Sequence, residues 1–146
     1  MATNKQAFQK KMADRHENEI ADVWPEASKT IASGAKFEKG DLKTNEVEQI
    51  SFVVECKCTQ NVSYSITEKV WNEVKEHSQN RSWTSRPALC IRLYGKTEEE
   101  TSWGGTRTNT PEQLPVELDL VVLDLNDFLE FYEQYLELKS KQEKES

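Results

Sequence analysis

The sequence predicts a single α/β domain in which a central mixed β-sheet is flanked by helices. Segments rich in β-branched and aliphatic residues, which favour buried strands, alternate with segments whose apolar residues recur at helical spacing. The 146 residues are enough for one hydrophobic core, and we expect residues 1–138 to form one domain. The expected helices are 11–24, 65–80 and 126–136, and the expected strands are 52–59, 87–94 and 118–123.

The amino-terminal helix is indicated by Met12, His16 and Ile20, which repeat at helical spacing, and by the proline that ends the pattern. Residues 1–11 are polar, and we expect them to be frayed. Residues 26–40 are mostly small and polar, which predicts a short strand followed by a loop.

The stretch 34–59 carries the most specific pattern in the chain. Glu55 and Lys57 follow an apolar, β-branched run, and because strand side chains alternate, the two share one face. A charge pair at the end of a core-like strand costs free energy unless a divalent metal and a polyanionic substrate compensate it. Thirteen residues separate Asp41 from Glu55, enough for a short strand and a turn that bring the two carboxylates together.

In the second half of the chain, Ser65 and Glu68 have the spacing of a capping box, which predicts the start of a helix. Residues 95–115 predict a long loop, a kind that is usually functional or disordered in compact domains. Within it, Trp103 would either stack on an unpaired base or pack on the domain surface or a partner subunit. We expect Asn126 to cap the last helix and the tail 139–146 to be disordered.

The charge distribution bounds the classes of partner. The net charge is −7, but residues 1–110 hold 16 basic and 16 acidic side chains, whereas residues 111–146 hold 3 and 10. The excess acid is confined to the carboxy-terminal segment, so a nucleic-acid partner for the remainder is not excluded. No apolar run approaches a membrane span, and the amino terminus lacks a signal-peptide pattern, which predicts a cytoplasmic protein and no membrane partner.

Other chemistries have little support in the sequence. Cys56, Cys58 and Cys90 lie in expected strands without the spacing of a zinc site, so we expect buried free thiols. His16 and His77 fit surface or half-buried positions better than the role of a general base. The chain shows neither a Ser/His/Asp constellation nor a glycine-rich phosphate loop.

Asp41 and the run Glu55-Cys56-Lys57 resemble the D…ExK signature of the PD-(D/E)xK, or restriction-endonuclease-like, nucleases. Glu17 in the first helix and Ser33 before the aspartate make the pattern similar to the archaeal-type Holliday-junction resolvases and related phage nucleases. The resemblance covers roughly residues 12–95. A departure is the glycine that stands before Asp41 in place of the proline of the signature.

The resemblance implies a restriction-endonuclease-like fold and a metal-dependent DNA endonuclease that hydrolyses phosphodiester bonds, with branched DNA as the expected substrate. Mg²⁺ or Mn²⁺ would be held by Asp41, Glu55 and the backbone carbonyl of Cys56, and Glu17 would bind a second ion or a metal-bound water. Lys57 would orient the attacking water or stabilise developing charge. Ser33 would hydrogen-bond a phosphate near the scissile bond.

Three lysines surround the expected site, and their interpretation stays open between ordinary loop residues and contacts to DNA phosphates. They are Lys36, Lys39 and Lys43. A junction resolvase must make two symmetric cuts, so the resemblance also implies a homodimer.

Three alternatives remain at this point. The chain would be a nuclease of the same fold without junction specificity, such as a flap- or end-directed DNase. It would otherwise be a catalytically silent module that binds DNA or another protein. The third alternative is a small regulatory protein whose acidic carboxy-terminal helix mimics DNA or docks a partner.

Overall fold

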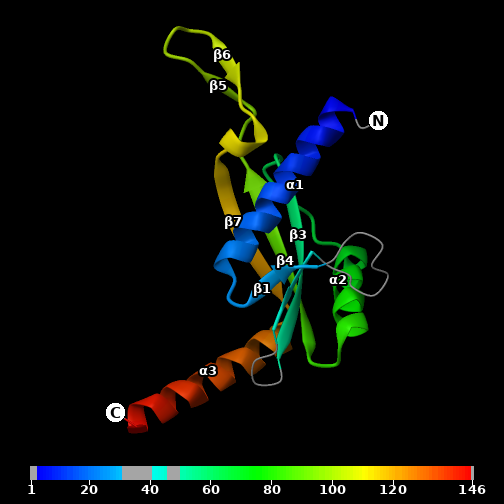
Figure 1. The fold of residues 1–146 in the computed structure, drawn as a ribbon, viewed down its shortest axis with the longest axis vertical. Coiled ribbons are helices and arrows are strands. Elements are labelled where there is room, and N and C mark those ends of the chain that lie inside the picture. The colour runs from blue at the N-terminus through cyan, green and yellow to red at the C-terminus, as the bar shows by residue number, and fades with distance from the viewer. Residues whose placement is uncertain (1–2, 31–40, 46–49, 146) are drawn as a thin grey trace.

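The computed structural model describes residues 3–30, 41–45 and 50–145. It is an α/β structure built on a five-stranded mixed sheet in the order β1-β2-β3-β4-β7 (Figure 1), which confirms the predicted class. β3 and β4 are parallel, and the other neighbouring strands are antiparallel. The strands are β1 (Ala27–Lys29), β2 (Leu42–Thr44), β3 (Ser51–Thr59), β4 (Ser85–Tyr94) and β7 (Val116–Leu123).

Two helices cover opposite faces of this sheet (Figure 1). α1 (Asn4–Val23) packs Ile20 against Leu42 and Val54, and α2 (Glu68–Arg81) packs Val74 against Leu89 and Ile91. The alternation predicted for β3 is confirmed, because Val54 and Cys56 lie under α1 whereas Glu55 reaches a side chain of α2. Over the described ranges, no helix is long and apolar enough to cross a membrane.

Both helix starts differ from the sequence-based expectation. α1 begins at Asn4 rather than near residue 11, because Thr3 and Gln6 form a reciprocal capping box that holds the first turn. α2 begins at Glu68 because Thr67, not Ser65, accepts the hydrogen bond of the Val70 N–H. In each case a threonine hydroxyl takes up a backbone donor that has no partner within its own helix.

The carboxy-terminal third also departs from expectation. Residues 95–115 are not a plain loop: they contain a hairpin of β5 (Glu98–Glu100) and β6 (Thr106–Thr108), then a short 3₁₀ helix, η1 (Pro111–Gln113). α3 (Leu125–Glu145) is capped by the Asp124 carboxylate rather than by Asn126. It continues through the tail predicted to be disordered, where lysine, glutamine and glutamate are strong helix formers.

A buried arginine joins three elements of the fold. Arg92 of β4, only 3% exposed, makes a bidentate pair with Asp119 of β7 at 2.7 and 2.9 Å. Its third donor contacts Glu19 of α1 at 2.9 Å and the Tyr94 hydroxyl at 3.3 Å. Because both carboxylates lie at the surface end of the pair, the guanidinium is desolvated while its partners remain partly in water.

This arrangement predicts a large loss of stability on removal of the guanidinium. We expect Arg92→Leu to lower the free energy of unfolding by about 2–4 kcal/mol, since a buried ion-pair network loses its central cation. The matched control is Arg107→Leu, which removes an exposed pair with Glu99 in the hairpin and should cost less than about 1 kcal/mol. Urea unfolding of both variants measures the difference, and equal losses would contradict this role for Arg92.

Candidate functional site

Asp41 is held at the end of β2, beside the strand that carries Glu55 and Lys57. Its backbone N–H donates to the Val54 carbonyl at 2.9 Å, and its Oδ2 accepts the N–H of Cys56 at 2.7 Å. Strand carbonyls two residues apart point to the same side, so the Cys56 carbonyl lies on the edge of β3 that faces Asp41. The structure therefore brings together Asp41 and the Glu55-Cys56-Lys57 run, as the sequence predicts.

Glu55 lies on the opposite face from α1 and is 7% exposed. Its Oε1 pairs with Nδ1 of His77, which projects from α2. Burial raises the pKa of the Glu55 carboxyl, and the neighbouring Asp41 carboxylate raises it further, whereas His77 and Lys57 act against the shift. His77 is thus the nearest polar partner of a buried acid, a role that the sequence analysis did not give it.

Glu17 reaches the same region from the other face of the sheet. It projects from α1, and its Oε2 lies 3.6 Å from the Nζ of Lys29 in β1. Burial, followed by repulsion from Asp41, raises the pKa of Glu17 from 4.5 to about 7, and Lys29 only partly offsets this. Two glutamates on opposite faces of the sheet are therefore both destabilised as carboxylates, first by burial and then by the charge of Asp41.

A cleft of about 710 Å³ gathers most of these groups. Its walls come from α1, from the end of β2 and from the last residues of β3. Lys57, which is half-buried, is among its lining residues. The lining side chains that matter for chemistry are Glu17, Asp41, Cys56 and Lys57, and they are joined by Lys5, Gln9 and Gln60.

Several predicted residues cannot be placed in this cleft. Ser33, Lys36 and Lys39 lie outside the described residues. Lys43 lies in β2 with Val53 and Ser28 as its register partners on the two neighbouring strands. The predicted phosphate contact of Lys43 stays a prediction.

The donor set fits a hard divalent cation by chemistry. Carboxylate and carbonyl oxygens are the ligands that Mg²⁺ and Mn²⁺ prefer, and a cation near Asp41 would relieve the repulsion that raises the pKa of Glu17 and Glu55. Within the described ranges, however, no three His, Cys, Asp or Glu side chains form a group that could hold a metal ion as they stand. Glu55 is engaged by His77, and one oxygen of Asp41 by the Cys56 N–H.

The cysteines and His16 are structural in character. Cys56, Cys58 and Cys90 are free thiols, as predicted, and burial raises the pKa of the Cys56 thiol above its ordinary range. His16 of α1 was expected at the surface or half-buried, which is wrong: it is 1% exposed, and neither ring nitrogen has a hydrogen-bond partner among the described residues. Burial lowers the pKa of His16 to about 4, so it is neutral at physiological pH.

The sequence feature that could have identified His77 as a site residue is its position within the expected helix. Val70, Val74, His77 and Ser78 are spaced by four, three and one residues, so His77 belongs to the stripe that α2 turns toward the sheet. A histidine within such a stripe must find a polar partner. The sequence alone cannot identify Glu55 as that partner, because the pairing depends on where α2 crosses β3.

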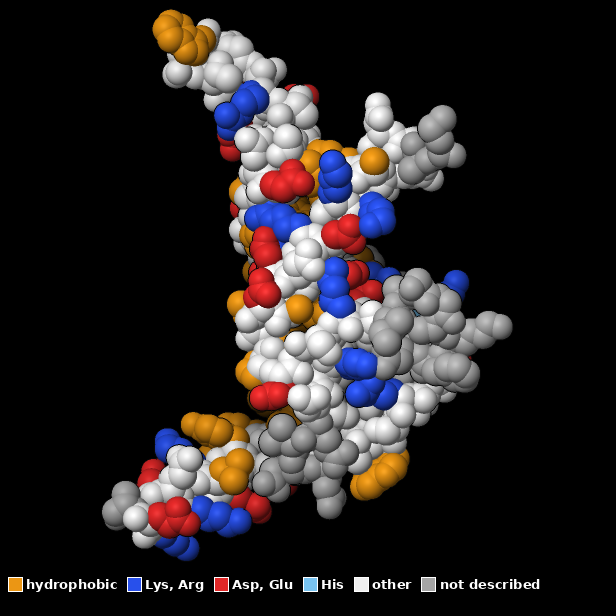
Figure 2. All heavy atoms as spheres, in the orientation of Figure 1, with side chains coloured by type: hydrophobic (Ala, Val, Ile, Leu, Met, Phe, Trp, Pro, Cys, Tyr) orange, Lys and Arg blue, Asp and Glu red, His pale blue; other side chains and the backbone are white. Residues whose placement is uncertain are grey.

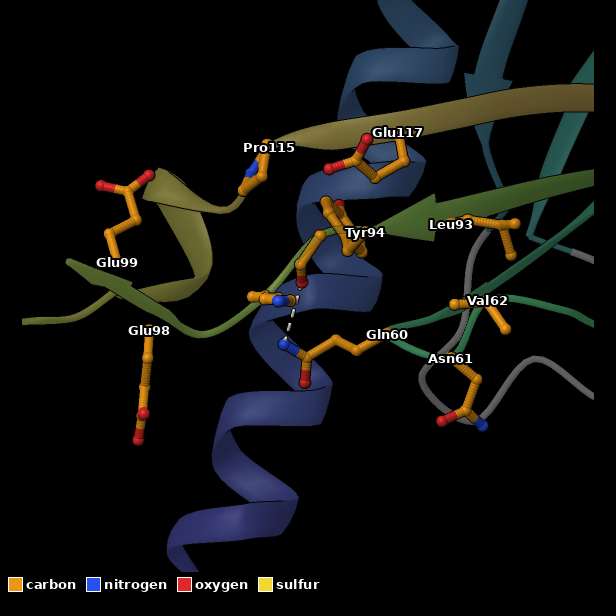
Figure 3. Close-up of a pocket in the computed structure, with 11 residues that line it drawn as sticks. Gln60, Asn61, Val62, Leu93, Tyr94, Glu98, Glu99, Pro115 and Glu117 are labelled. Atoms are coloured by element: carbon orange, nitrogen blue, oxygen red, sulfur yellow. Dashed lines mark hydrogen bonds between the residues drawn. The ribbon is translucent and has the colours of Figure 1, made fainter. Parts of the chain in front are cut away.

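A second cavity, of about 580 Å³, lies at the base of the β5–β6 hairpin (Figure 3). It adjoins the cleft through Gln60 and Asn61, which line both, and the Gln60 amide donates to the Gly95 carbonyl at 3.4 Å. Glu98, Glu99 and Glu117 contribute carboxylates to its wall, against a single lysine. Three acids make this cavity a poor site for a phosphate, so the cleft is the better candidate.

No family model matches this sequence, and no curated protein does. The ground for assigning a function is therefore the chemistry of Glu17, Asp41, Glu55 and Lys57.

The raised pKa of Glu17 predicts a pH dependence of stability. The folded chain holds the Glu17 proton up to about pH 7 and the unfolded chain only to about 4.5, so wild-type stability should fall as pH rises through this window. Glu17→Gln cannot ionise. It should exceed wild type at about pH 8 by on the order of 1 kcal/mol and lose the advantage near pH 4.5.

Urea unfolding in EDTA at several pH values measures this effect. Glu73→Gln, at an exposed position of α2, is the matched control and should keep the pH dependence of wild type. An unchanged pH dependence in Glu17→Gln would contradict the assignment.

Proposed function

We propose that the chain is a Mg²⁺- or Mn²⁺-dependent DNA endonuclease of the restriction-endonuclease-like fold, acting on branched DNA. The observation that carries the proposal is that Glu17, Asp41, Cys56 and Lys57, from three separate elements, line one cleft. The element order of helix, three strands, helix and strand supports it, since the D…ExK resemblance implies this order. The site residues are therefore those that the resemblance names, as far as the described residues contain them.

The residues of the chain divide the work of hydrolysis as follows. Asp41, Glu55 and the Cys56 carbonyl would hold the metal ion, with Glu17 beside them. When bound, the ion would supply positive charge and lower the pKa of a water molecule. Lys57 lines the same cleft and would orient the attacking water or stabilise charge on the phosphate. The Cys56 N–H fixes the Asp41 carboxylate, so this ligand would need little reorganisation on metal binding.

DNA would approach a surface of mixed charge. On the face shown in Figure 2, basic and acidic side chains are interspersed along α1. Salt bridges account for part of this pattern, with Lys10 on Asp14 at 2.8 Å and Arg15 on Glu19 at 2.6 Å. Because these cations are already neutralised, we expect affinity to come mainly from the metal site and from Lys57.

The branched substrate is the finer part of the proposal. A four-way junction has two equivalent strands to cut, and a two-fold homodimer would present one cleft to each. Trp103 at the tip of the β5–β6 hairpin is 94% exposed, so it does not pack on its own domain. An exposed indole on a projecting ribbon supports stacking on an unpaired base or contact with a partner subunit, the two roles left for it.

Cleavage of a labelled four-way junction tests the proposal. We expect paired symmetric nicks with Mg²⁺ and none with EDTA. Lys57→Ala should lower the rate at least about a hundredfold because it removes a charge that acts in the transition state. Lys69→Ala, at an exposed position of α2, is the matched control and should cut as wild type does.

A matched linear duplex separates the outcomes. Metal-dependent cutting of both substrates would keep the nuclease and remove the junction specificity. If folded protein cuts neither substrate with any divalent metal, the catalytic proposal fails, and a DNA- or protein-binding module becomes the better interpretation.

The contact between His77 and Glu55 yields a further prediction. Since His77 holds the buried carboxylate in place, His77→Ala should raise the Mg²⁺ concentration needed for half-maximal cleavage by about tenfold to a hundredfold. His77→Asn retains a donor and should restore most of the loss. An unchanged Mg²⁺ dependence in His77→Ala would show that the contact only contributes to packing.

A further inference from the structure

A third cavity, of about 450 Å³, lies between α3 and the part of the domain formed by the end of α1, β2 and β3. Its aromatic side chains are Trp24 at the end of α1, Phe52 in β3, and Phe131 and Tyr135 in α3. One charged side chain, Glu26, joins them, and the described residues that line the cavity include no basic one. Aromatic rings with a single carboxylate indicate the binding of an organic cation.

Three of these rings form a continuous row. The ring centroids of Trp24 and Phe52 lie 5.3 Å apart, and those of Phe52 and Phe131 lie 4.9 Å apart. The ring planes are inclined to one another by 66° and 55°, so their faces point in different directions. Ring faces carry negative electrostatic potential, and several inclined rings are the usual surroundings of a bound organic cation.

Glu26 has an unusual backbone conformation at the edge of this cavity. Its φ is 62°, and it is the only non-glycine residue with a positive φ in the described ranges. Pro25 precedes it and the Ala27 N–H donates to the Trp24 carbonyl at 3.2 Å, as in a type II turn, where glycine is preferred at this position. A glutamate there costs free energy that a glycine would not. Strain of this kind is typical of functional positions, and here it places a carboxylate beside aromatic rings.

The Glu26 carboxylate is oriented by Asn45, which follows β2 and also lines the cavity. The Asn45 side-chain amide donates to Oε2 of Glu26 at 2.9 Å, and its backbone N–H donates to the Glu26 carbonyl at 3.3 Å. Over the described part of the chain, no cation forms an ion pair with Glu26. An oriented carboxylate oxygen is therefore left to accept a hydrogen bond from a ligand.

α3 adds negative charge to the surroundings of the cavity. Residues 124–137 contain five acidic and no basic side chains. Two of the acids, Asp127 and Glu130, lie 3.5 and 3.6 Å from Arg86, which does not line the cavity. The electrostatic field here therefore favours a cation and opposes a polyanion such as nucleic acid.

The combination of rings and carboxylate favours a guanidinium over other organic cations. A quaternary ammonium has no hydrogen to donate to Glu26. A lysine ammonium has three, but it is compact and strongly hydrated, which makes its transfer from water to an aromatic surface less favourable. A guanidinium is weakly hydrated, stacks on ring faces and donates several hydrogen bonds from one plane.

α3 turns different faces to the cavity and to solvent. It projects from one end of the domain, and none of its residues is buried (Figure 1). Phe131 and Tyr135 line the cavity, at helical spacing. A second apolar stripe follows the spacing of another face, and none of its members lines the cavity. This outward stripe consists of Leu125, Phe128, Leu129, Tyr132 and Leu136.

We propose that this cavity binds an arginine side chain of a partner protein, with the guanidinium between the aromatic rings and hydrogen-bonded to Glu26. The bound side chain would contact α3 and the domain at once, and it would add packing that α3 lacks. The inference does not rest on the nuclease proposal, because the cavity and the cleft share no lining residue over the described ranges.

NMR titration of the full ¹⁵N-labelled chain with three capped tripeptides tests the proposal. The central residue is arginine, lysine or citrulline, the neutral isostere of arginine, between two glycines. The arginine peptide should shift the Trp24 indole N–H and the amides of Glu26 and Tyr135 saturably, with a dissociation constant on the order of 1 mM. The lysine peptide should bind about threefold more weakly, and the citrulline peptide at least about tenfold, since it carries no charge.

Matched substitutions localise the site. Tyr135→Leu removes a ring of the cavity and should weaken binding of the arginine peptide about threefold to fivefold. Tyr132→Leu, on the outward stripe of the same helix, should bind as wild type does. Glu26→Gln should weaken binding about threefold, whereas Glu133→Gln, which removes the same charge at an exposed position of α3, should change it little.

Several outcomes would overturn the proposal. Equal affinity for the arginine and citrulline peptides would leave only an apolar cavity, and lysine binding as tight as arginine would contradict the choice of a guanidinium. Equal losses in Tyr132→Leu and Tyr135→Leu would remove the site from this face of α3. The absence of saturable shifts, or shifts confined to the cavity at the β5–β6 hairpin, would also contradict it.

Discussion

The hydrogen bond from the Cys56 N–H to the Asp41 carboxylate is the contact on which the candidate site depends. β2 has only three residues. Its pairing with β3 ends at Leu42, which lies opposite Val54 and directly follows Asp41 in the chain; both side chains of this pair are buried. The side-chain bond to Cys56 extends this pairing by one residue and fixes the carboxylate beside β3. Burial raises the pKa of the neighbouring Glu17 and Glu55 carboxyls, and the charge held on Asp41 raises both further. The same bond thus holds the acid where its charge makes both glutamates harder to ionise.

Sequence reasoning recovered the parts of this arrangement that depend on short-range periodicity. The strand alternation separates Glu55 from Cys56, and the short connection brings Asp41 to β3; both follow from a period of two and a count of residues. His77 was missed because its pairing with Glu55 depends on the crossing of α2 over the sheet, which no local pattern encodes. Two helix caps were each misplaced by two residues, because two hydrogen-bonding side chains there compete for the same backbone donors, as Asp124 and Asn126 do. The start of α1 was misplaced by seven residues, because the capping box of Thr3 and Gln6 was not recognised.

The misjudged carboxy-terminal segment has a different physical cause. The charged and polar residues at its end are compatible with a disordered tail and are also strong helix formers. Composition alone therefore does not distinguish a disordered tail from an exposed helix. The apolar stripe of α3 is visible in the sequence as amphipathic spacing, and this pattern predicts a buried face. What the sequence cannot state is that the domain leaves this face uncovered. The face stays uncovered because α3 starts at the end of β7 and leads away from the sheet (Figure 1).

The distribution of charge along the chain also explains how an acidic protein is compatible with a polyanionic substrate. Acidic side chains of the carboxy-terminal segment flank the apolar stripe of α3, keep it soluble and repel nucleic acid from it. The sheet order places this segment beyond β4, whereas the cleft lies at β2 and β3. Since residues 1–110 are neutral overall, the net charge of −7 belongs to residues 111–146 and not to the cleft.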